Sequence, residues 1–222
     1  IEELGRVLCN VCNVVPGGIV CFFPSYDYEK AVHSAWEKSG TIQKIQLKKR
    51  VFREPKRSGL AENVLAEYTT CIQRCAAWQG SVTGALLMSV VGGKMSEGIN
   101  FSDDLGRCVV MVGLPYPNIN SPELKEKMNY LNSHFPPGQD GKQAGQVHYE
   151  NLCMKAVNQS IGRAIRHRND YASILLLDQR YLRSSVTSML PQWISQHLQS
   201  AENFVSVMKA LPKFFNSHKT KP

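Results

Sequence analysis

The chain has 222 residues, 43% of them hydrophobic and 20% charged, which suits a globular domain and excludes a disordered, collagen-like or disulfide-scaffold chain. Its 26 lysines and arginines outnumber its 18 acidic residues, and the net charge of +8 favours a polyanionic partner, nucleic acid before an acidic surface. The apolar runs at 19–23 and 174–177 are far shorter than the roughly 18 residues of a membrane helix, so we expect no membrane partner.

Short β-branched runs alternate with helical stretches along the chain. In chain order the predicted elements are a strand at 19–23, a helix at 26–38, a strand at 42–47, a helix from about 60 to the stop at Gly80, strands at 85–91 and 107–112, helices at 122–131 and 150–161, a strand at 174–177, and helices within 184–210. This order predicts an α/β fold with a parallel sheet flanked by helices on both faces.

The remaining segments are predicted to be irregular. The segment 133–147 contains two prolines and three glycines and is expected to be a mobile loop. The segment 211–222 is expected to be a basic tail. Because no internal repeat or second composition class is visible, we expect a single domain over 1–222. The chain begins with Ile1, without a basic signal segment, which favours a fragment of a longer intracellular protein.

Basic residues and cysteines are two compositional features with competing interpretations. Seven basic residues and one acid, Glu54, lie within 41–60, and this run predicts either a nucleic-acid contact or a solvated face. The seven cysteines are an odd number and include Cys9 and Cys12, with Cys71 and Cys75 about 60 residues later. That separation makes a zinc site a weak prediction, so we expect structural thiols and no metal site in this chain.

Ligands of open parallel sheets gather at the carboxyl ends of strands. We expect three segments there: 24–26, the glycine-rich loop 92–101, and the turn that leads from Gly162 and Arg163 into the last strand. The loop 92–101 suits either close approach to a phosphate or a tight connection. It is not a complete phosphate-binding loop, because Met88 stands where the first glycine belongs and Met95 where the final serine or threonine belongs.

The strongest local pattern is Gln159-Ser-Ile-Gly162-Arg163-Ala-Ile-Arg166. Arg163 and Arg166 are predicted to share a helix face, with Gln159 one turn earlier. Two guanidinium groups on one face suit an anion whose charge grows in a transition state, as in phosphoryl transfer. The competing interpretation is a basic helix end at the surface.

Together these segments resemble a known family. Glu97-Gly-Ile-Asn-Phe101 and Gln159 to Arg166 resemble motifs V and VI of superfamily 2 helicases, and Val20 to Ser25 resembles motif IV. The fuller strings 94–101 and 162–168 are similar to the XPD-like iron–sulfur DNA helicases. Within that group, 113–118 and 158–162 look most like the vertebrate ChlR-type helicases linked to sister-chromatid cohesion.

The resemblance implies a second, RecA-like motor lobe that works with ATP and Mg²⁺ shared with a first lobe. That first lobe would carry the phosphate-binding loop, the Mg²⁺-binding acids and a [4Fe–4S] cluster. The implied activity is ATP-driven 5′ to 3′ movement on single-stranded or forked DNA in the nucleus, in DNA repair and genome maintenance. Implied partners are the first lobe and proteins of cohesion and the replication fork. We expect the 222-residue chain alone not to hydrolyse ATP.

The resemblance also implies roles for individual residues. At the nucleotide it places Arg166 as the arginine finger, with Arg163 and Gln159 as catalytic partners, and it adds Glu97, Gly98, Asn100 and Gly162 to the ATP site. At the DNA it places Ser25, Tyr26, Lys94 and Ser96. The XPD-like pattern usually has an aspartate where this chain has Asn100, so an amide replaces a carboxylate at a position expected near the ribose.

Two other functions are compatible with the same residues. One is a motor that translocates on RNA or on duplex, since backbone contacts discriminate the sugar weakly. The other is a non-catalytic nucleic-acid or protein-docking module on a degenerate RecA lobe. The spacing of Gln159, Gly162, Arg163 and Arg166 counts against docking alone, because a docking surface does not require it.

Overall fold

The computed structural model describes residues 1–77, 80–95, 100–201 and 203–219. The strands are β1 (Gly17–Phe23), β2 (Arg50–Arg53), β3 (Gly84–Val90), β4 (Cys108–Val112) and β5 (Ser173–Leu177). The helices are α1 (Glu2–Val14), α2 (Tyr26–Lys38), α3 (Thr41–Gln46), α4 (Ser58–Ala77), α5 (Pro122–His134), α6 (Ala144–Ile161), α7 (Ser184–Thr187), α8 (Gln192–Ser195) and α9 (Phe204–Lys219). Two short 3-10 helices are η1 (Asp103–Leu105) and η2 (Gln179–Leu182). Of the helices in the described ranges, none is long and apolar enough to cross a membrane.

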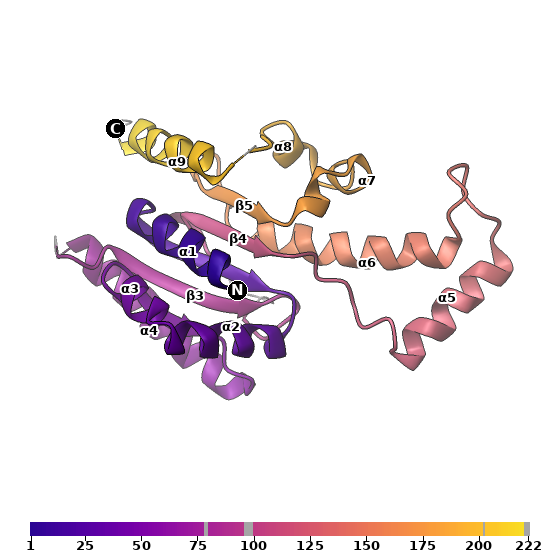
Figure 1. The fold of residues 1–222 in the computed structure, drawn as a ribbon, viewed down its shortest axis with the longest axis horizontal. Helices are drawn as coiled ribbons and strands as arrows, with labels where there is room; N and C mark the ends of the chain where they lie inside the picture. The colour runs from indigo at the N-terminus through magenta and orange to yellow at the C-terminus, as the bar shows by residue number, and fades with distance from the viewer. Residues whose placement is uncertain (78–79, 96–99, 202, 220–222) are drawn as a thin grey trace.

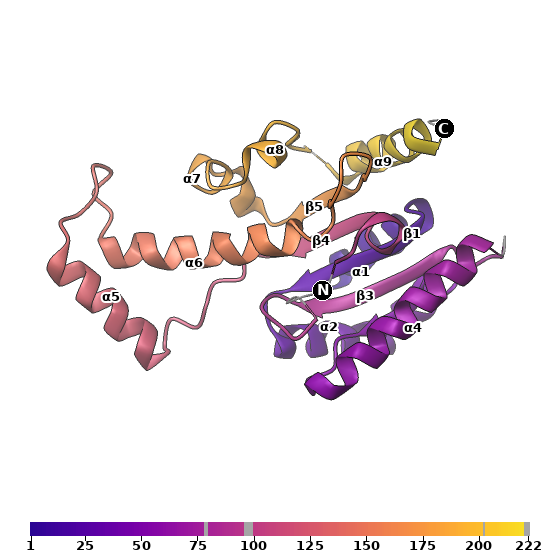
Figure 2. The ribbon, with the colours of Figure 1, turned by 180° about the vertical axis from the view of Figure 1, so that it is seen from behind.

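The strands form one sheet in the order β2-β3-β1-β4-β5, and each neighbouring pair is parallel. Side chains of β1 alternate between two apolar cores: Val20 and Phe22 lie in one, and Ile19, Cys21 and Phe23 lie in the other. The first core is covered by α4, α6, η2, α7 and α8, and the second by α1, α2, α3 and α9. Figures 1 and 2 show these two helical layers from opposite sides. The predicted α/β fold class is thus confirmed.

Parallel strands give the sheet two chemically distinct ends. We call the side where strands finish, at Phe23, Arg53 and Val90 among others, the carboxyl end of the sheet, and the opposite side the amino end. The segments 24–26 and 91–95 follow β1 and β3 and lie at the carboxyl end, as predicted. The turn 162–172 precedes β5 and therefore lies at the amino end, so its predicted placement at the carboxyl ends was wrong.

Several predicted boundaries also differ. The segment predicted as a strand at 42–47 is helix α3, because Ile42 and Ile45, three residues apart, both point into the core shared with α1 and α2. Helix α1 was not predicted. The expected loop 133–147 contains the end of α5 and the start of α6, which leaves 135–143 as the connection, and α9 continues through most of the expected basic tail to Lys219. Figure 1 shows α5 and the beginning of α6 extending beyond the sheet as an arm.

Candidate functional site

At the carboxyl end of the sheet, the structure brings together three residues that the sequence assigned to DNA binding. Ser25 caps α2, where its Oγ accepts the Tyr28 N–H at 3.1 Å. The half-buried Tyr26 follows it, and its hydroxyl accepts the Lys94 N–H at 3.4 Å. The Lys94 side chain is exposed. Ser96, assigned to the same surface, lies outside the described residues.

Glu54 connects the segments of Tyr26 and Lys94 through hydrogen bonds. It was not identified from the sequence as a functional residue. Its Oε1 accepts the Tyr26 hydroxyl at 2.7 Å and the Met95 N–H at 3.1 Å, and its Oε2 accepts the Ser89 hydroxyl at 2.5 Å and the Val90 N–H at 2.9 Å. The side chain is buried, so these four donors replace water for both oxygens. Burial, and next the hydrogen bond to Glu54, raise the pKa of Tyr26 to about 12.

Gly93 is needed where the chain passes Glu54. A Cβ built at this position would lie 2.2 Å from Glu54 Oε1 and 2.9 Å from the Tyr26 hydroxyl. Those atoms are held by the hydrogen bonds that link Glu54 to Tyr26 at the start of α2 and to Ser89 and Val90 in β3, so they are not free to move aside. The loop thus contains a glycine because the backbone approaches a carboxylate of its own chain, which a search for phosphate-binding glycines does not consider.

The basic run at 41–60 does not form one surface. Lys49 is fully buried near the amino end, where its Nζ donates to the carbonyls of Gly17 and Thr83 at 2.8 and 3.2 Å. Arg53 makes a bidentate pair with Glu29 at 2.7 and 2.8 Å. Lys56 and Arg57 are exposed beyond the end of β2, and Lys56 Nζ lies 5.8 Å from the Tyr26 ring centroid. Only part of the run therefore adds charge beside Tyr26.

The residues of the predicted nucleotide site lie at the amino end. Helix α6 ends at Ile161, with Gln159 exposed on its last turn and Gly162 as the C-cap. Arg163 and Arg166 follow the helix in an irregular loop, so the prediction that they share a helix face was wrong. Gly162 donates its N–H to the Asn158 carbonyl at 2.9 Å, and the chain turns away there. Arg163 is half-buried and Arg166 is exposed.

A main-chain hydrogen bond joins the two sequence motifs at this end. The Phe101 N–H donates to the Arg163 carbonyl at 3.1 Å, which places the exposed Asn100 directly beside the turn of Arg163. Phe101 is fully buried and anchors this contact in the core. Glu97 and Gly98, assigned to the same site, lie outside the described residues. This hydrogen bond thus joins two segments that are more than 60 residues apart in the sequence.

Gln159 and Arg166 line two different hollows. One of about 630 Å³ is lined by Asn151, Met154, Lys155, Asn158, Gln159 and Met189. The other, of about 320 Å³, is lined by Ile165, Arg166, His167, Arg168 and Trp193. Both are shallow and open to solvent. The Gln159 amide and the Arg166 guanidinium therefore line separate hollows, and a nucleotide that meets both side chains would have to span them.

The cysteines lie on both sides of the sheet. Cys12, Cys21, Cys108 and Cys153 are buried, and burial raises the pKa of each thiol, to about 12 for Cys12 and Cys108 and to about 11 for Cys153. Within the described ranges, the one set of three ligand-type side chains close enough to share a metal is Asp103, His167 and Asp170, and it contains no cysteine. Buried thiols with raised pKa values are typical of cysteines with a structural role.

Comparisons with known proteins agree with the motifs. The helicase C-terminal domain family matches residues 8–197. The chain is 58% identical over 214 residues to the mouse ATP-dependent DNA helicase DDX11, covering 96% of this chain and 24% of that protein. It is 59% identical over 214 residues to the zebrafish DDX11, with the same coverage, and 44% identical over 220 residues to fission yeast chl1, covering 99% of this chain and 25% of that protein.

Solved structures share the fold. A chain titled XPD helicase superposes with a TM-score of 0.55 at 22% identity over 85% of this chain and 29% of that one. The Xpd4 protein of S. tokodaii gives 0.52 at 23% identity over 86% and 33%. The chain spans about a quarter of the length of the curated relatives it matches. The fold, the joined motifs and these similarities show that the chain belongs to the helicase C-terminal domain family, with the DDX11 and CHL1 helicases as close homologues.

Proposed function

We propose that this chain is the second motor lobe of an ATP-dependent DNA helicase and supplies the arginines that complete the ATP site of a first lobe. The observation that carries the proposal is the 3.1 Å hydrogen bond from the Phe101 N–H to the Arg163 carbonyl, which holds the two nucleotide motifs together. With Gln159 and Arg166 exposed beside this contact, the amino end of the sheet is a surface built to meet a partner lobe.

The residues present fit the phosphates of ATP. Guanidinium groups offer planar donor forks that remain charged, which suits the charge that develops on a transferred phosphoryl group. Arg166 is the arginine finger in this proposal, and Arg163 supports the same charge. Gln159 orients the nucleotide or the attacking water, while Asn100 and Gly162 border the nucleotide. ATP supplies the phosphoryl group, and its Mg²⁺ belongs with acids of the first lobe. The [4Fe–4S] cluster that the XPD-like resemblance implies also belongs to the first lobe.

The carboxyl end of the sheet is proposed as the DNA track. Ser25, Tyr26 and Lys94 lie together there, and the exposed Lys56 and Arg57 add positive charge that a phosphate backbone would meet. Because the Tyr26 hydroxyl already donates to Glu54, we expect DNA to meet other parts of this residue. Contacts of this kind position a strand without reading its sequence.

The wider role follows the relatives. Those reported above from mouse, zebrafish and fission yeast are named ATP-dependent DNA helicases, and two of them are named DDX11. Following the resemblance to the XPD-like helicases, we propose movement on single-stranded or forked DNA with 5′ to 3′ polarity, in the nucleus. A contribution to DNA repair and sister-chromatid cohesion, beside replication-fork proteins, is the biological setting that the ChlR-type resemblance supports.

The test is DNA-stimulated ATP hydrolysis by the protein that joins this chain to a first helicase lobe. Arg166→Ala should lower kcat at least about 10³-fold, the range observed for arginine fingers, while DNA binding persists. Arg6→Ala is the control, since Arg6 is an exposed arginine on α1 that lines neither of the two hollows described above, and its kcat should stay within about twofold of the wild type. Retained hydrolysis in Arg166→Ala would instead favour the docking module. Equal stimulation by RNA or by duplex would favour the alternative translocase.

A further inference from the structure

A buried carboxylate, Asp170, accepts main-chain hydrogen bonds within the loop that carries Arg166. Its side chain is 0% exposed, and it lies four residues after Arg166 and three before β5 begins. Its Oδ2 accepts the Arg166 N–H at 3.3 Å, and its Oδ1 accepts the Tyr171 N–H at 2.9 Å. A carboxylate buried without donors would be strongly unfavourable, so this loop conformation and the burial of Asp170 depend on each other.

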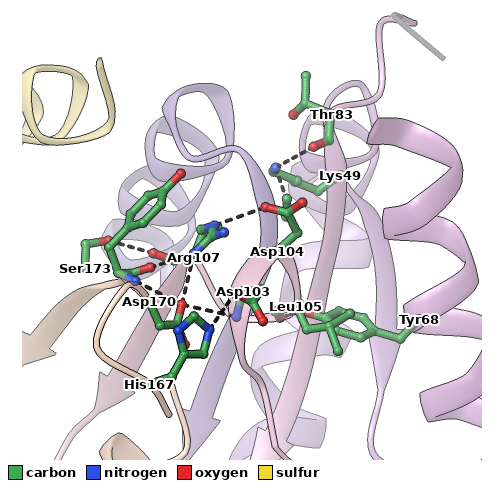
Figure 3. Close-up of polar contacts among 12 residues, drawn as sticks. Lys49, Tyr68, Thr83, Asp103, Asp104, Leu105, Arg107, His167, Asp170 and Ser173 are labelled. Carbon is green, nitrogen blue, oxygen red and sulfur yellow. Dashed lines mark hydrogen bonds and ion pairs between the residues drawn. The ribbon is translucent and has the colours of Figure 1, made fainter. Parts of the chain in front are cut away.

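Arg107 holds Asp170 from the start of β4. Its Nη1 lies 3.1 Å from Asp170 Oδ1 and 3.0 Å from the Tyr171 carbonyl, and its Nε lies 3.1 Å from Asp104 Oδ1. The Arg107 side chain is only 9% exposed, and its guanidinium stacks 3.9 Å from the Tyr171 ring centroid. Figure 3 shows Arg107 between Asp104 and Asp170. Charge-assisted bonds in such a buried position are among the stronger ones in proteins.

The turn η1 contacts the Arg166 loop through Asp103. Asp103 donates its N–H to Asp170 Oδ1 at 3.2 Å, and its own Oδ1 lies 3.0 Å from His167 Nε2. Its φ of 55° is an uncommon conformation for a residue other than glycine, and both contacts help to maintain it. On the other side, the buried Tyr68 hydroxyl donates to the Leu105 carbonyl at 2.6 Å (Figure 3). The Arg166 loop is thus tied to a turn that α4 anchors.

A metal ion is not the better explanation of this cluster. Asp103, His167 and Asp170 offer ligand atoms within 4.8 Å of one another. However, the Asp170 carboxylate already accepts three N–H groups and the Arg107 guanidinium. A cation would have to displace Arg107, a positive charge buried against the same oxygen. The cluster therefore holds η1 and the loop 162–172 together through hydrogen bonds and an ion pair.

We propose that Asp170 is a positioning residue for hydrolysis, which fixes the main chain at Arg166 so that this exposed side chain reaches the nucleotide from a defined point. Arg107 acts one step further back by holding Asp170. The proposal rests on the function proposed above, in which Arg166 is the finger. Because misplacement of a catalytic group by about 1 Å can cost about 100-fold in rate, the positioning contribution should be measurable separately from ATP affinity.

The test compares variants of the protein that contains both helicase lobes. In Asp170→Asn, an amide of the same shape places an NH₂ group against donors, so kcat should fall about 10- to 100-fold with little change in KM for ATP. Amide hydrogen exchange at Arg166 and Tyr171 should accelerate while amides of β4 stay protected. The matched control is Asp178→Asn, which weakens an Asp–Arg pair with Arg180 at the other end of β5 and should keep kcat within about twofold.

A second variant covers the case in which Asp170→Asn fails to fold. Asp170→Leu combined with Arg107→Met removes both charges together, which buried pairs often tolerate, but still leaves the Arg166 N–H without its acceptor. This folded variant should show the same loss in kcat. Wild-type kcat in either folded variant, with Arg166→Ala inactive, would overturn the positioning role and leave the proposed function intact. An active Arg166→Ala would instead overturn the proposed function. The amide exchange at Arg166 does not depend on activity, so it tests whether Asp170 holds this main chain in either case.

Discussion

The two ends of the sheet each contain a buried carboxylate that accepts main-chain N–H groups from a loop, but the remaining partners differ in charge. At the carboxyl end, Glu54 accepts two hydroxyls and two N–H groups. At the amino end, Asp170 accepts three N–H groups and the Arg107 guanidinium. Glu54 is bound by neutral donors, and the nearby Lys56 and Lys94 are exposed. At the amino end, Arg107 is buried against Asp170, and Arg166 is exposed.

The largest loss of stability is expected from removing the buried Arg107–Asp170 ion pair at the amino end of the sheet. Arg107→Ala leaves Asp170 buried without its cation and should lower the free energy of unfolding by about 3–5 kcal/mol, measured by urea denaturation. Arg180→Ala is the comparison, because its pair with Asp178 is partly exposed and should contribute about 1 kcal/mol or less. Equal losses in the two variants would mean that the amino end does not depend on its buried ion pair.

A second buried cation at the amino end sharpens the comparison, because Lys49 has carbonyl partners in place of a carboxylate. Burial lowers the pKa of Lys49 to about 8. The folded protein thus releases this proton at a lower pH than the unfolded chain does. The cost of burying charged Lys49 therefore lowers the free energy of unfolding by its full amount below pH 8, and by less toward pH 10. Between pH 7 and pH 10, the wild type should gain about 2 kcal/mol relative to Lys49→Met.

The control for that series is Lys44→Met, since Lys44 is exposed on α3. Because this change leaves Lys49 and its two carbonyl partners in place, the Lys44→Met variant should gain stability between pH 7 and pH 10 as the wild type does. Parallel pH curves for wild type and Lys49→Met would show that Lys49 remains charged inside the protein, and that its two carbonyls hold the ammonium as effectively as water does.

The smallest effect is expected at the neutral end. Glu54→Gln retains one acceptor oxygen and turns an NH₂ group toward donors, so the free energy of unfolding should fall by about 1–2 kcal/mol. DNA affinity of the two-lobed protein should fall a few-fold, while hydrolysis without DNA is unchanged. Glu123→Gln, an exposed change on α5, should alter neither. If stability falls but DNA affinity does not, Glu54 supports the fold alone.

The sequence was most informative where local chemistry decides structure. The helix predicted at 26–38 matches α2 because Ser25 supplies an N-cap and Gly40, at φ 73°, follows its last turn. Strand β2 was missed since Arg50 and Arg53 flank only two apolar residues, Val51 and Phe52. The motifs drew attention to Gln159, Arg163 and Arg166, but the spacing of the two arginines predicted a shared helix face, whereas the helix ends at Ile161.

The supporting residues could not be found in this way. Glu54 appeared as an interruption in a basic run, and Asp170 as one polar residue in a polar loop. Their roles depend on burial and on partners more than 30 and 60 residues away in the sequence, respectively, such as Ser89 for Glu54 and Arg107 for Asp170. The placement of 162–172 was wrong for a different reason: chain order alone puts a segment that leads into a parallel strand at the amino end of the sheet.

Tyr68 links both ends of the sheet through one ring. It packs edge-on against Phe52, two residues before Glu54, with centroids 5.8 Å apart, and against Phe101, beside the Arg163 contact, at 6.3 Å. Its hydroxyl bonds the Leu105 carbonyl of η1. A fluorine atom introduced on this ring would thus be a single spectroscopic probe, with a resonance that changes when either loop is displaced from the core.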